Sequence, residues 1–203
     1  MARDDTTIDV YNQRARQYAD IPANTDDDAT LTAFLKHIPA GGRILDFGCG
    51  PGEQAAAMSS QGFAVTASDA SSAMVEIARQ QPGVEVVQAT FEQLDDIGVY
   101  DGIWANFSLL HSPKADLPSH LNRVAKALKP EGIFHIAVKV GIGEIRDKLG
   151  RFYSYYSSEE LLNLLQDAGF RKLEELTGEG TGLAGDVSPW VSMIARVDRS
   201  DGH

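Results

Sequence analysis

The feature that most constrains the fold of this chain is a glycine-rich turn between a short apolar segment and a helix-forming one. Arg43–Phe47 predicts a buried strand, Gly48–Gly52 forms the turn, and Glu53–Gln61 predicts a helix. Glycine has no side chain, so a ligand can lie directly against the backbone of such a turn. The arrangement is common to many cofactor sites, and by itself it does not identify the cofactor.

Short strands and helices alternate along most of the chain. Helices are expected over about 7–19 and 27–38, and a last helix is expected to begin with a capping box, Ser157 and Glu160. Strands joined through helices pair in parallel, which predicts a doubly wound α/β sheet. Ligands of such sheets bind beyond the carboxyl ends of the strands, where the strand order reverses. The predicted strands are 43–47, 63–68, 84–87, 100–105, 133–140, 172–176 and 191–197.

Two carboxylates beside the turn narrow the choice of cofactor. Asp46 ends the first strand and would repel a pyrophosphate, since two unit charges about 4 Å apart interact by roughly 4 kcal/mol at an effective dielectric of about 20. Glu53 also stands where the dinucleotide fingerprint G-x-G-x-x-G needs its third glycine. Asp46 favours an ammonium instead, and Asp69, after the second strand, suits the hydroxyls of a ribose. The alternative is that Asp46 is a solvated or capping carboxylate and that Asp69 caps the next helix.

Five segments carry a resemblance to one protein family: Leu45–Gly52, Ala67–Met74, Ala89–Glu92, Tyr100–His111 and Leu128–Ile133. In this order they are similar to the successive motifs of class I S-adenosylmethionine-dependent methyltransferases, particularly the small methyltransferase domain 11 or 25 type. The resemblance implies a Rossmann-like, doubly wound and mostly parallel seven-stranded sheet with helices on both faces. It also implies S-adenosyl-L-methionine as the cofactor and S-adenosyl-L-homocysteine as the product.

The length of 203 residues predicts a single domain, which the resemblance divides into three parts. Residues 1–40 would form an N-terminal helical lid, because residues 11–18 resemble the lid helix common in this family. Residues 43–140 would be the cofactor-binding core. Residues 141–203 would supply the elements on the substrate side.

Positions that match the family's motifs are expected to contact the cofactor. The methionine part would lie against the first turn and the end of the fourth strand, which contribute Asp46, Gly48, Cys49, Gly50, Ala105 and Asn106. The ribose and adenine would be held by Asp69, Ala70, Met74, Thr90 and Phe91. Tyr11 or Tyr18 would close over the cofactor. Many relatives carry an acid where this chain has Ala89, so backbone groups would replace that contact with the adenine amino group.

Residues for the methyl acceptor are expected on the same rim. His111 follows the fourth strand and is the best candidate for a general base, because its ordinary pKa suits proton transfer near neutrality. A packing histidine at a helix start is the alternative. The connection 141–156 combines glycines, three cations and four aromatics, which predicts either a substrate lid or a solvated loop whose aromatics cover the core. The substrate-binding candidates are His111, Arg146, Arg151, Tyr153 and Tyr155, with Tyr153 as a second catalytic candidate.

The net charge of −11 and the sequence pI of about 4.8 limit the expected partners. Nucleic acids and anionic membranes attract surfaces rich in Lys and Arg, so neither is expected as a partner. No apolar run approaches the roughly 18 residues that span a bilayer, and the charged N-terminus lacks a signal-peptide pattern. The histidines have no metal-ligand spacing, so no metal is expected, and the sole cysteine, Cys49, fits a cytoplasmic protein.

The predicted function is therefore methyl transfer from S-adenosylmethionine, by in-line displacement, to a small polar or anionic acceptor. Three other functions stay open: a nicotinamide-dependent oxidoreductase, a non-catalytic S-adenosylmethionine-binding regulatory module, and an RNA methyltransferase. Asp46 and the missing third glycine argue against the first, and the acidity of the chain argues against the last. The sequence predicts neither the acceptor atom nor the oligomeric state.

Overall fold

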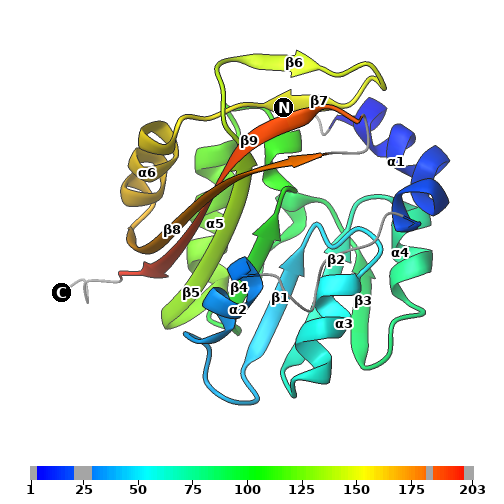
Figure 1. Ribbon diagram of the computed structural model, residues 1–203. Coiled ribbons are helices and arrows are strands. Elements are labelled where there is room, and N and C mark those ends of the chain that lie inside the picture. Colours follow the sequence, from blue (N-terminus) through cyan, green and yellow to red (C-terminus); the bar gives the residue numbers. More distant parts are fainter. Residues whose placement is uncertain (1–3, 21–28, 182–184, 199–203) are drawn as a thin grey trace.

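The fold is built on one seven-stranded sheet, which Figure 1 shows running through the centre of the molecule. The computed structural model describes residues 4–20, 29–181 and 185–198. The strand order is β3-β2-β1-β4-β5-β9-β8; the first five of these pair in parallel, and β9 is antiparallel to both of its neighbours. The predicted α/β class with a mostly parallel sheet is confirmed. The strands are β1 (Arg43–Phe47), β2 (Ala64–Asp69), β3 (Val84–Gln88), β4 (Tyr100–Asn106), β5 (Leu128–Lys139), β8 (Phe170–Thr181) and β9 (Val187–Val197).

Helices cover both faces of this sheet. On one face, Phe34 of α2 and Met58 of α3 belong to a buried cluster with Trp104 of β4. On the other, Leu121 of α5 and Leu165 of α6 belong to a second cluster with other side chains of the same strands. In the described part of the chain, no helix has the length and apolar character needed to cross a membrane. The helices are α1 (Asp5–Ala19), α2 (Ala29–Leu35), α3 (Glu53–Ser60), α4 (Ser72–Ala78), α5 (Leu117–Ala127) and α6 (Ser158–Asp167), with short 3-10 turns η1 (Phe91–Gln93) and η2 (Leu109–His111).

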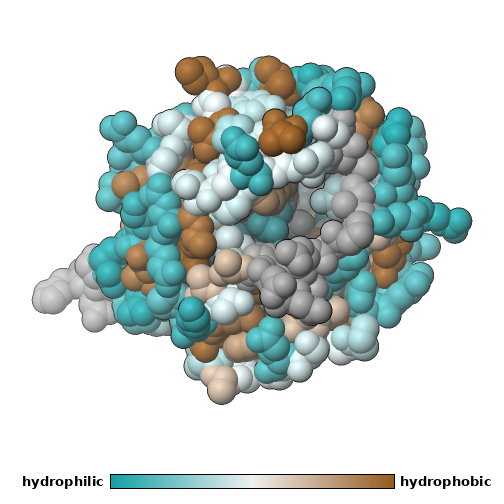
Figure 2. Space-filling model, viewed as in Figure 1, coloured by the Kyte–Doolittle hydropathy of each residue, from teal (hydrophilic) through white to brown (hydrophobic). Residues whose placement is uncertain are grey.

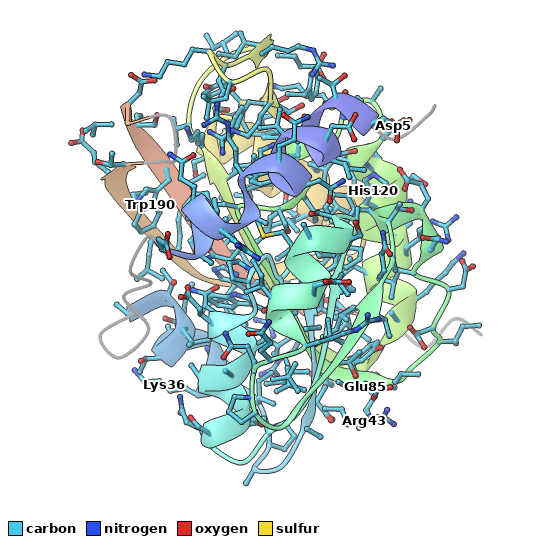
Figure 3. All side chains as sticks on the ribbon, turned by 90° about the vertical axis from the view of Figure 1, so that its right-hand side faces the viewer. Asp5, Lys36, Arg43, Glu85, His120 and Trp190 are labelled. Atoms are coloured by element: carbon cyan, nitrogen blue, oxygen red, sulfur yellow. The ribbon has the colours of Figure 1, made fainter. Side chains whose placement is uncertain are left out.

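The parallel strands all finish at one end of the molecule, and helix α1 crosses that end. β1 pairs with both β2 and β4, so the strand order reverses beside it. In Figure 3, Arg43 and Glu85, at the beginning of β1 and of β3, lie at the bottom, whereas Asp5, the first residue of α1, lies at the top. Ligands of such sheets bind where the order reverses, which puts α1 above the expected binding position.

The C-terminal third differs most from the sequence prediction. The segment 141–156 contains an antiparallel hairpin, β6 (Glu144–Arg146) and β7 (Phe152–Ser154), where a loop-like lid was expected. β8 and β9 are both longer than predicted, because each strand supplies the other's backbone hydrogen bonds. Gly178 lowers the strand tendency of β8, yet it pairs with Trp190, and a β-carbon there would lie 2.5 Å from the Trp190 ring. A large ring thus occupies the space that a side chain would need.

The helix ends follow the predicted caps in part. The Ser157 hydroxyl accepts a hydrogen bond from the Glu160 backbone at 3.0 Å, which is one half of the predicted capping box. The Glu160 carboxylate instead binds Lys114 Nζ at 2.7 and 2.8 Å. Gly62 follows α3 with a φ of +90°, as expected for a glycine that ends a helix. Of the helix predicted over 27–38, residues 27 and 28 lie outside the described residues, and the rest contains α2.

Candidate active site

The glycine turn after β1 is fixed on its sheet side and bare on the other. The backbone N–H groups of Gly48 and Cys49 both donate to the Ser68 carbonyl, at 2.8 and 2.9 Å. Gly48 and Gly50 have φ values of +86° and +53°, a region that favours glycine. A β-carbon at Gly48 would lie 2.3 Å from the β-carbon of Ser108. The backbone therefore has no room for a side chain at Gly48, and the turn leaves its free edge to the cavity.

Asp46 lies at the base of this turn and is 3% exposed. Its carboxylate oxygen Oδ2 is buried and has no hydrogen-bond partner among the described residues. Burial, reinforced by the neighbouring carboxylate of Asp69, raises the pKa of Asp46 to about 8, and a hydrogen bond from the Ala55 backbone opposes the rise. A buried carboxylate with a free oxygen is strongly stabilised by a cation that reaches it. Asp46 lines a cavity through which a cation can do so.

Asp69 ends β2 and joins the turn to the next helix. Its Oδ2 accepts a hydrogen bond from the Gly50 backbone at 2.9 Å, and its Oδ1 accepts one from the Ser71 backbone at 2.8 Å. Burial raises the pKa of Asp69, and these hydrogen bonds oppose the rise. The cap of α4 is Ser71, whose hydroxyl accepts from Met74, so the alternative of Asp69 as that cap is wrong. Each carboxylate oxygen still has a lone pair for a ligand hydroxyl.

The residues expected around the adenine lie together. Ala70, Met74, Thr90 and Phe91 line the same cavity as the two acids. The Phe91 ring packs edge-on against Phe47, with ring centroids 4.9 Å apart. The structure therefore gives this end of the cavity an apolar wall of the kind that holds a flat ring.

At the end of β4, the structure brings only one of the two expected residues to the cavity. Asn106 lines it, whereas Ala105 is fully buried within the sheet, so its predicted carbonyl contact stays a prediction. Gln54, which the sequence reasoning did not single out, accepts hydrogen bonds from Asn106 Nδ2 at 3.1 Å and from Trp104 Nε1 at 2.7 Å. Its position in the first turn of α3, directly after the glycine turn, is the signal that would have found it.

The cavity has a volume of about 370 Å³ and lies at the carboxyl ends of β1, β2 and β4. Figure 2 shows a hollow near the centre of the viewed face. The lining comes from α1, the glycine turn, η1 and η2, with Thr181 from the end of β8. Residues that sequence reasoning did not select also line it, namely Asp4, Thr7, Ile8, Gln54, Ser71, Glu92, Phe107, Ser108, Ser112, Pro113 and Asp116.

Helix α1 closes the cavity and is attached to elements on both sides of it. The Asn12 Oδ1 atom accepts hydrogen bonds from the Ser71 hydroxyl at 2.7 Å and from the Ala73 backbone at 3.2 Å. The Thr7 hydroxyl accepts one from the Phe152 backbone at 2.8 Å. Tyr11 and Tyr18, the two lid tyrosines expected from the sequence, both line the cavity. Figure 3 shows α1 above α3 and α4.

His111 lies in the cavity wall with both ring nitrogens hydrogen-bonded. Nδ1 is 2.7 Å from the Phe152 carbonyl, which can only accept, so Nδ1 carries the proton. Nε2 therefore has the lone pair and accepts from the Tyr11 hydroxyl at 2.8 Å. Burial lowers the pKa of His111 to about 4, although the bond to Phe152 opposes the shift. His111 is thus a neutral proton acceptor whose Nε2 lone pair faces α1 and is occupied there by the Tyr11 hydroxyl.

The other residues expected to bind substrate lie behind this wall. Arg151 is 2% exposed; it donates to Asp147 at 2.7 and 3.0 Å and to the Tyr11 hydroxyl at 3.1 Å. Arg146 donates to both carboxylate oxygens of Asp4, at 2.7 and 3.0 Å. Neither arginine contributes to the described cavity lining, and neither do Tyr153 and Tyr155. Both guanidinium groups bind residues in or beside α1, the N-terminal lid helix. Their predicted pairing with a substrate anion has no support in this arrangement.

No group of three or more His, Cys, Asp or Glu side chains is arranged to hold a metal ion in the part of the chain that the structure describes. Cys49 is partly buried in the turn, and burial, together with Asp46 and Asp69, raises the pKa of its thiol. A thiol with a raised pKa is a poor nucleophile near neutral pH. The chemistry of the site therefore rests on carboxylates, backbone groups, phenols and one histidine.

Comparison with known proteins identifies the family of this chain. A family model described as a methyltransferase domain matches residues 13–175. A Bacillus subtilis protein named "Putative methyltransferase YqeM" is 25% identical over 179 residues, which cover 79% of this chain and 72% of that protein. A ubiquinone biosynthesis O-methyltransferase of Rickettsia prowazekii is 36% identical over 96 residues, which cover 45% of this chain and 37% of that protein.

One solved structure resembles almost the whole chain. The 1,6-didemethyltoxoflavin-N1-methyltransferase of Burkholderia thailandensis superposes with a TM-score of 0.73 at 24% identity, covering 98% of this chain and 92% of that one. That structure contains 1,6-didemethyltoxoflavin and S-adenosylhomocysteine. At this identity the superposition establishes a shared fold.

Proposed function

Because this chain belongs to the methyltransferase domain family and is an S-adenosylmethionine-dependent methyltransferase, we propose that it methylates a small polar molecule bound under helix α1. The observation that carries the proposal is the pair of buried carboxylates, Asp46 and Asp69, on one wall of a cavity that α1 closes. Two similar proteins support a small acceptor by their names, one a ubiquinone biosynthesis enzyme and the other a 1,6-didemethyltoxoflavin methyltransferase.

Asp46 fits the ammonium of the cofactor's methionine part. Its buried Oδ2 lacks a partner, and an unsatisfied buried acceptor costs free energy until a donor completes it. Gly48 and Gly50 leave bare backbone beside it, along which the methionine chain can lie. An ammonium there satisfies the oxygen and restores the ionised form of Asp46.

Asp69 fits the ribose, and its neighbours fit the adenine. Both of its oxygens are oriented by backbone N–H groups, which leaves their remaining lone pairs for two ligand hydroxyls. Met74 and Phe91 provide the apolar surface on which the adenine ring would lie, with Thr90 beside it. We assign Tyr11 and Tyr18 to the closing wall over the cofactor.

His111 supplies the proton acceptor for the reaction. When bound, S-adenosylmethionine supplies a methyl group on a positively charged sulfur, which leaves as a neutral thioether. An acceptor O–H or N–H takes the place of the Tyr11 hydroxyl at His111 Nε2 and gives up its proton there. The Phe152 carbonyl holds the ring in the required tautomer. α1 aligns the two reactants by enclosing them.

Proton release on cofactor binding tests the role of Asp46. At pH 7 a carboxyl with a pKa of about 8 is mostly protonated in the free protein, and an approaching ammonium ionises it. Titration calorimetry with S-adenosylhomocysteine, repeated in buffers of different ionisation heat, is expected to report release of about one proton. Asp46→Asn should bind roughly 10- to 100-fold more weakly and release none. The matched control is Asp167→Asn, at an exposed position of α6, and unchanged proton release in Asp46→Asn would refute the role of Asp46.

The role of Asp69 has a separate test. Asp69→Ala is expected to weaken S-adenosylhomocysteine binding by about 1.5–3 kcal/mol, because charge-assisted hydrogen bonds to the ribose are lost. Circular dichroism must first show that the variant remains folded, since Asp69 also holds Gly50 and Ser71. A folded variant with wild-type affinity would contradict the assignment.

A further inference from the structure

The wall of the cavity carries charge of one sign. Within the described lining there is no Lys or Arg, and His111, its basic residue, is uncharged near neutral pH because burial lowers its pKa to about 4. An anion that entered would lose hydration and gain no counter-charge from the described lining. The lining carboxylates are Asp4, Asp46, Glu53, Asp69, Glu92 and Asp116.

The cations that β5 and the β6–β7 hairpin contribute beside α1 are already bound. Arg146 pairs with Asp4 at 2.7 Å, and Arg151 is buried against Asp147 at 2.7 Å. Lys139 lies 4.6 Å above the centre of the Tyr153 ring. Turning any of these toward an anionic substrate would break an existing interaction, and for Arg151 it would leave Asp147 without its partner.

One acid remains available after the cofactor is placed. Asp46 and Asp69 are assigned to the cofactor, and Glu53 directly follows the glycine turn along which the cofactor would lie. Asp4 is neutralised by Arg146. The Glu92 carboxylate already accepts hydrogen bonds from its own backbone and from Thr90, which lower its pKa against the effect of burial. Asp116 lines the cavity at the start of α5 and has no ion-pair partner in the described part of the chain. It is therefore the carboxylate free to meet a positive group.

We propose that the methyl acceptor is a small molecule with a basic nitrogen, whose positive charge lies beside Asp116 while its reacting atom lies toward His111. The inference rests on the proposed function, because it assumes that the acceptor fills the space the cofactor leaves. It predicts that carboxylates and phosphates bind poorly, and so narrows the polar or anionic acceptor expected from sequence. The net charge of −11 also favours the approach of cations over anions.

Matched sets of small compounds test the charge of the acceptor. Each set shares one phenolic skeleton and differs in one group, as in tyramine, 4-hydroxyphenylacetamide and 4-hydroxyphenylacetate. Ligand-observed NMR with protein saturated by S-adenosylhomocysteine would count binders over a few dozen skeletons. Amines are expected to bind most often and carboxylates least. Carboxylates that bind as often as amines would overturn the inference.

Asp116→Asn tests the position of the charge. The Asp116 side chain makes no capping hydrogen bond to α5, so the helix should survive the change. In Asp116→Asn the affinity for the amines is expected to fall about fivefold, whereas the affinity for the matched amides stays at the wild-type level. In the control Asp167→Asn both affinities should stay at the wild-type level. Amine affinity that is unchanged in Asp116→Asn would overturn the assignment. Absence of any S-adenosylhomocysteine binding to the wild type would instead refute the proposed function, which keeps the two failures distinct.

Discussion

Gly48 and Gly62 share a backbone conformation but have different surroundings. Their φ values are +86° and +90°; a β-carbon at Gly48 would lie 2.3 Å from Ser108, whereas nothing lies within 4 Å of one at Gly62. Gly62→Ala should cost about 1 kcal/mol of unfolding free energy for the conformation alone, and Gly48→Ala about 3 kcal/mol, since overpacking is added. Urea unfolding followed by circular dichroism measures both. Equal losses would show that the turn can shift to accept a side chain.

His111 gives a second prediction at the level of single residues. Its pKa of about 4 keeps it neutral from pH 6 to 8, so the rate should show no inflection from His111 in that range. With an acceptor that requires proton removal, His111→Gln should lower kcat about 10²- to 10⁴-fold and leave S-adenosylhomocysteine affinity near the wild-type level. An equal fall in cofactor affinity would indicate a structural role instead.

The same pKa has a consequence for stability. A histidine whose pKa is lower in the folded protein takes up its proton more easily when unfolded, so it removes stability as pH falls from about 6.5 toward 4. The wild type should therefore lose more unfolding free energy than His111→Gln over this interval. Denaturant unfolding at pH 7 and pH 4.5 checks the sign, and a larger loss in the variant would contradict the buried neutral form.

Among the elements, α1 determines whether the cavity stays closed. The Asn12 side chain joins α1 to the start of α4 through two hydrogen bonds. Removing that acceptor in Asn12→Ala should weaken the packing of α1 over the cavity by about 1 kcal/mol. We expect faster hydrogen exchange in residues 5–19 and about fivefold faster release of S-adenosylhomocysteine. Arg14→Ala, on the exposed side of the same helix, is the control and should change neither rate. Equal effects in the two variants would mean that Asn12 does not hold the lid.

The sequence predicts elements well where their pattern is local. β1 and the start of α3 were predicted at their observed positions, because a buried run, a glycine turn and a helix are all written in consecutive residues. The β6–β7 hairpin is absent from the prediction because its cross-strand partners lie six to ten residues apart and its outer strand, β6, is exposed. Pairing of that kind depends on the surface beneath it, here α1.

In the candidate site, too, residues in a local motif can be predicted from the sequence, whereas contacts between distant residues cannot. Asp46, Gly48 and Gly50 could be read from one motif, and Asp69 from its spacing to that motif. The contact of Arg151 with Tyr11 joins residues 140 positions apart, and no local pattern reveals it. Arg151 was therefore expected to face substrate, since a sequence shows that a charge is present but not which carboxylate it meets.

At the scale of the whole molecule, the net charge of −11 is expected to make S-adenosylmethionine and S-adenosylhomocysteine differ in how their association rates depend on salt. S-adenosylmethionine carries one net positive charge and S-adenosylhomocysteine carries none, so the negative field attracts only the former. Raising the salt concentration from about 20 to 500 mM should slow association of S-adenosylmethionine several-fold and leave that of S-adenosylhomocysteine nearly unchanged. Stopped-flow fluorescence measures both rates, and equal salt dependence would contradict the electrostatic contribution.

The contacts that hold α1 over the cavity also affect when, during its synthesis, the chain can first bind a ligand there. Synthesis releases this helix before the hairpin, because the groups that donate hydrogen bonds to Thr7 and Tyr11 follow 145 and 140 positions later. The helix must therefore wait until the hairpin has been made before it can dock there. Any tag or fusion placed ahead of Asp4 sits next to this late-docking helix, and would disturb binding long before it disturbed the sheet.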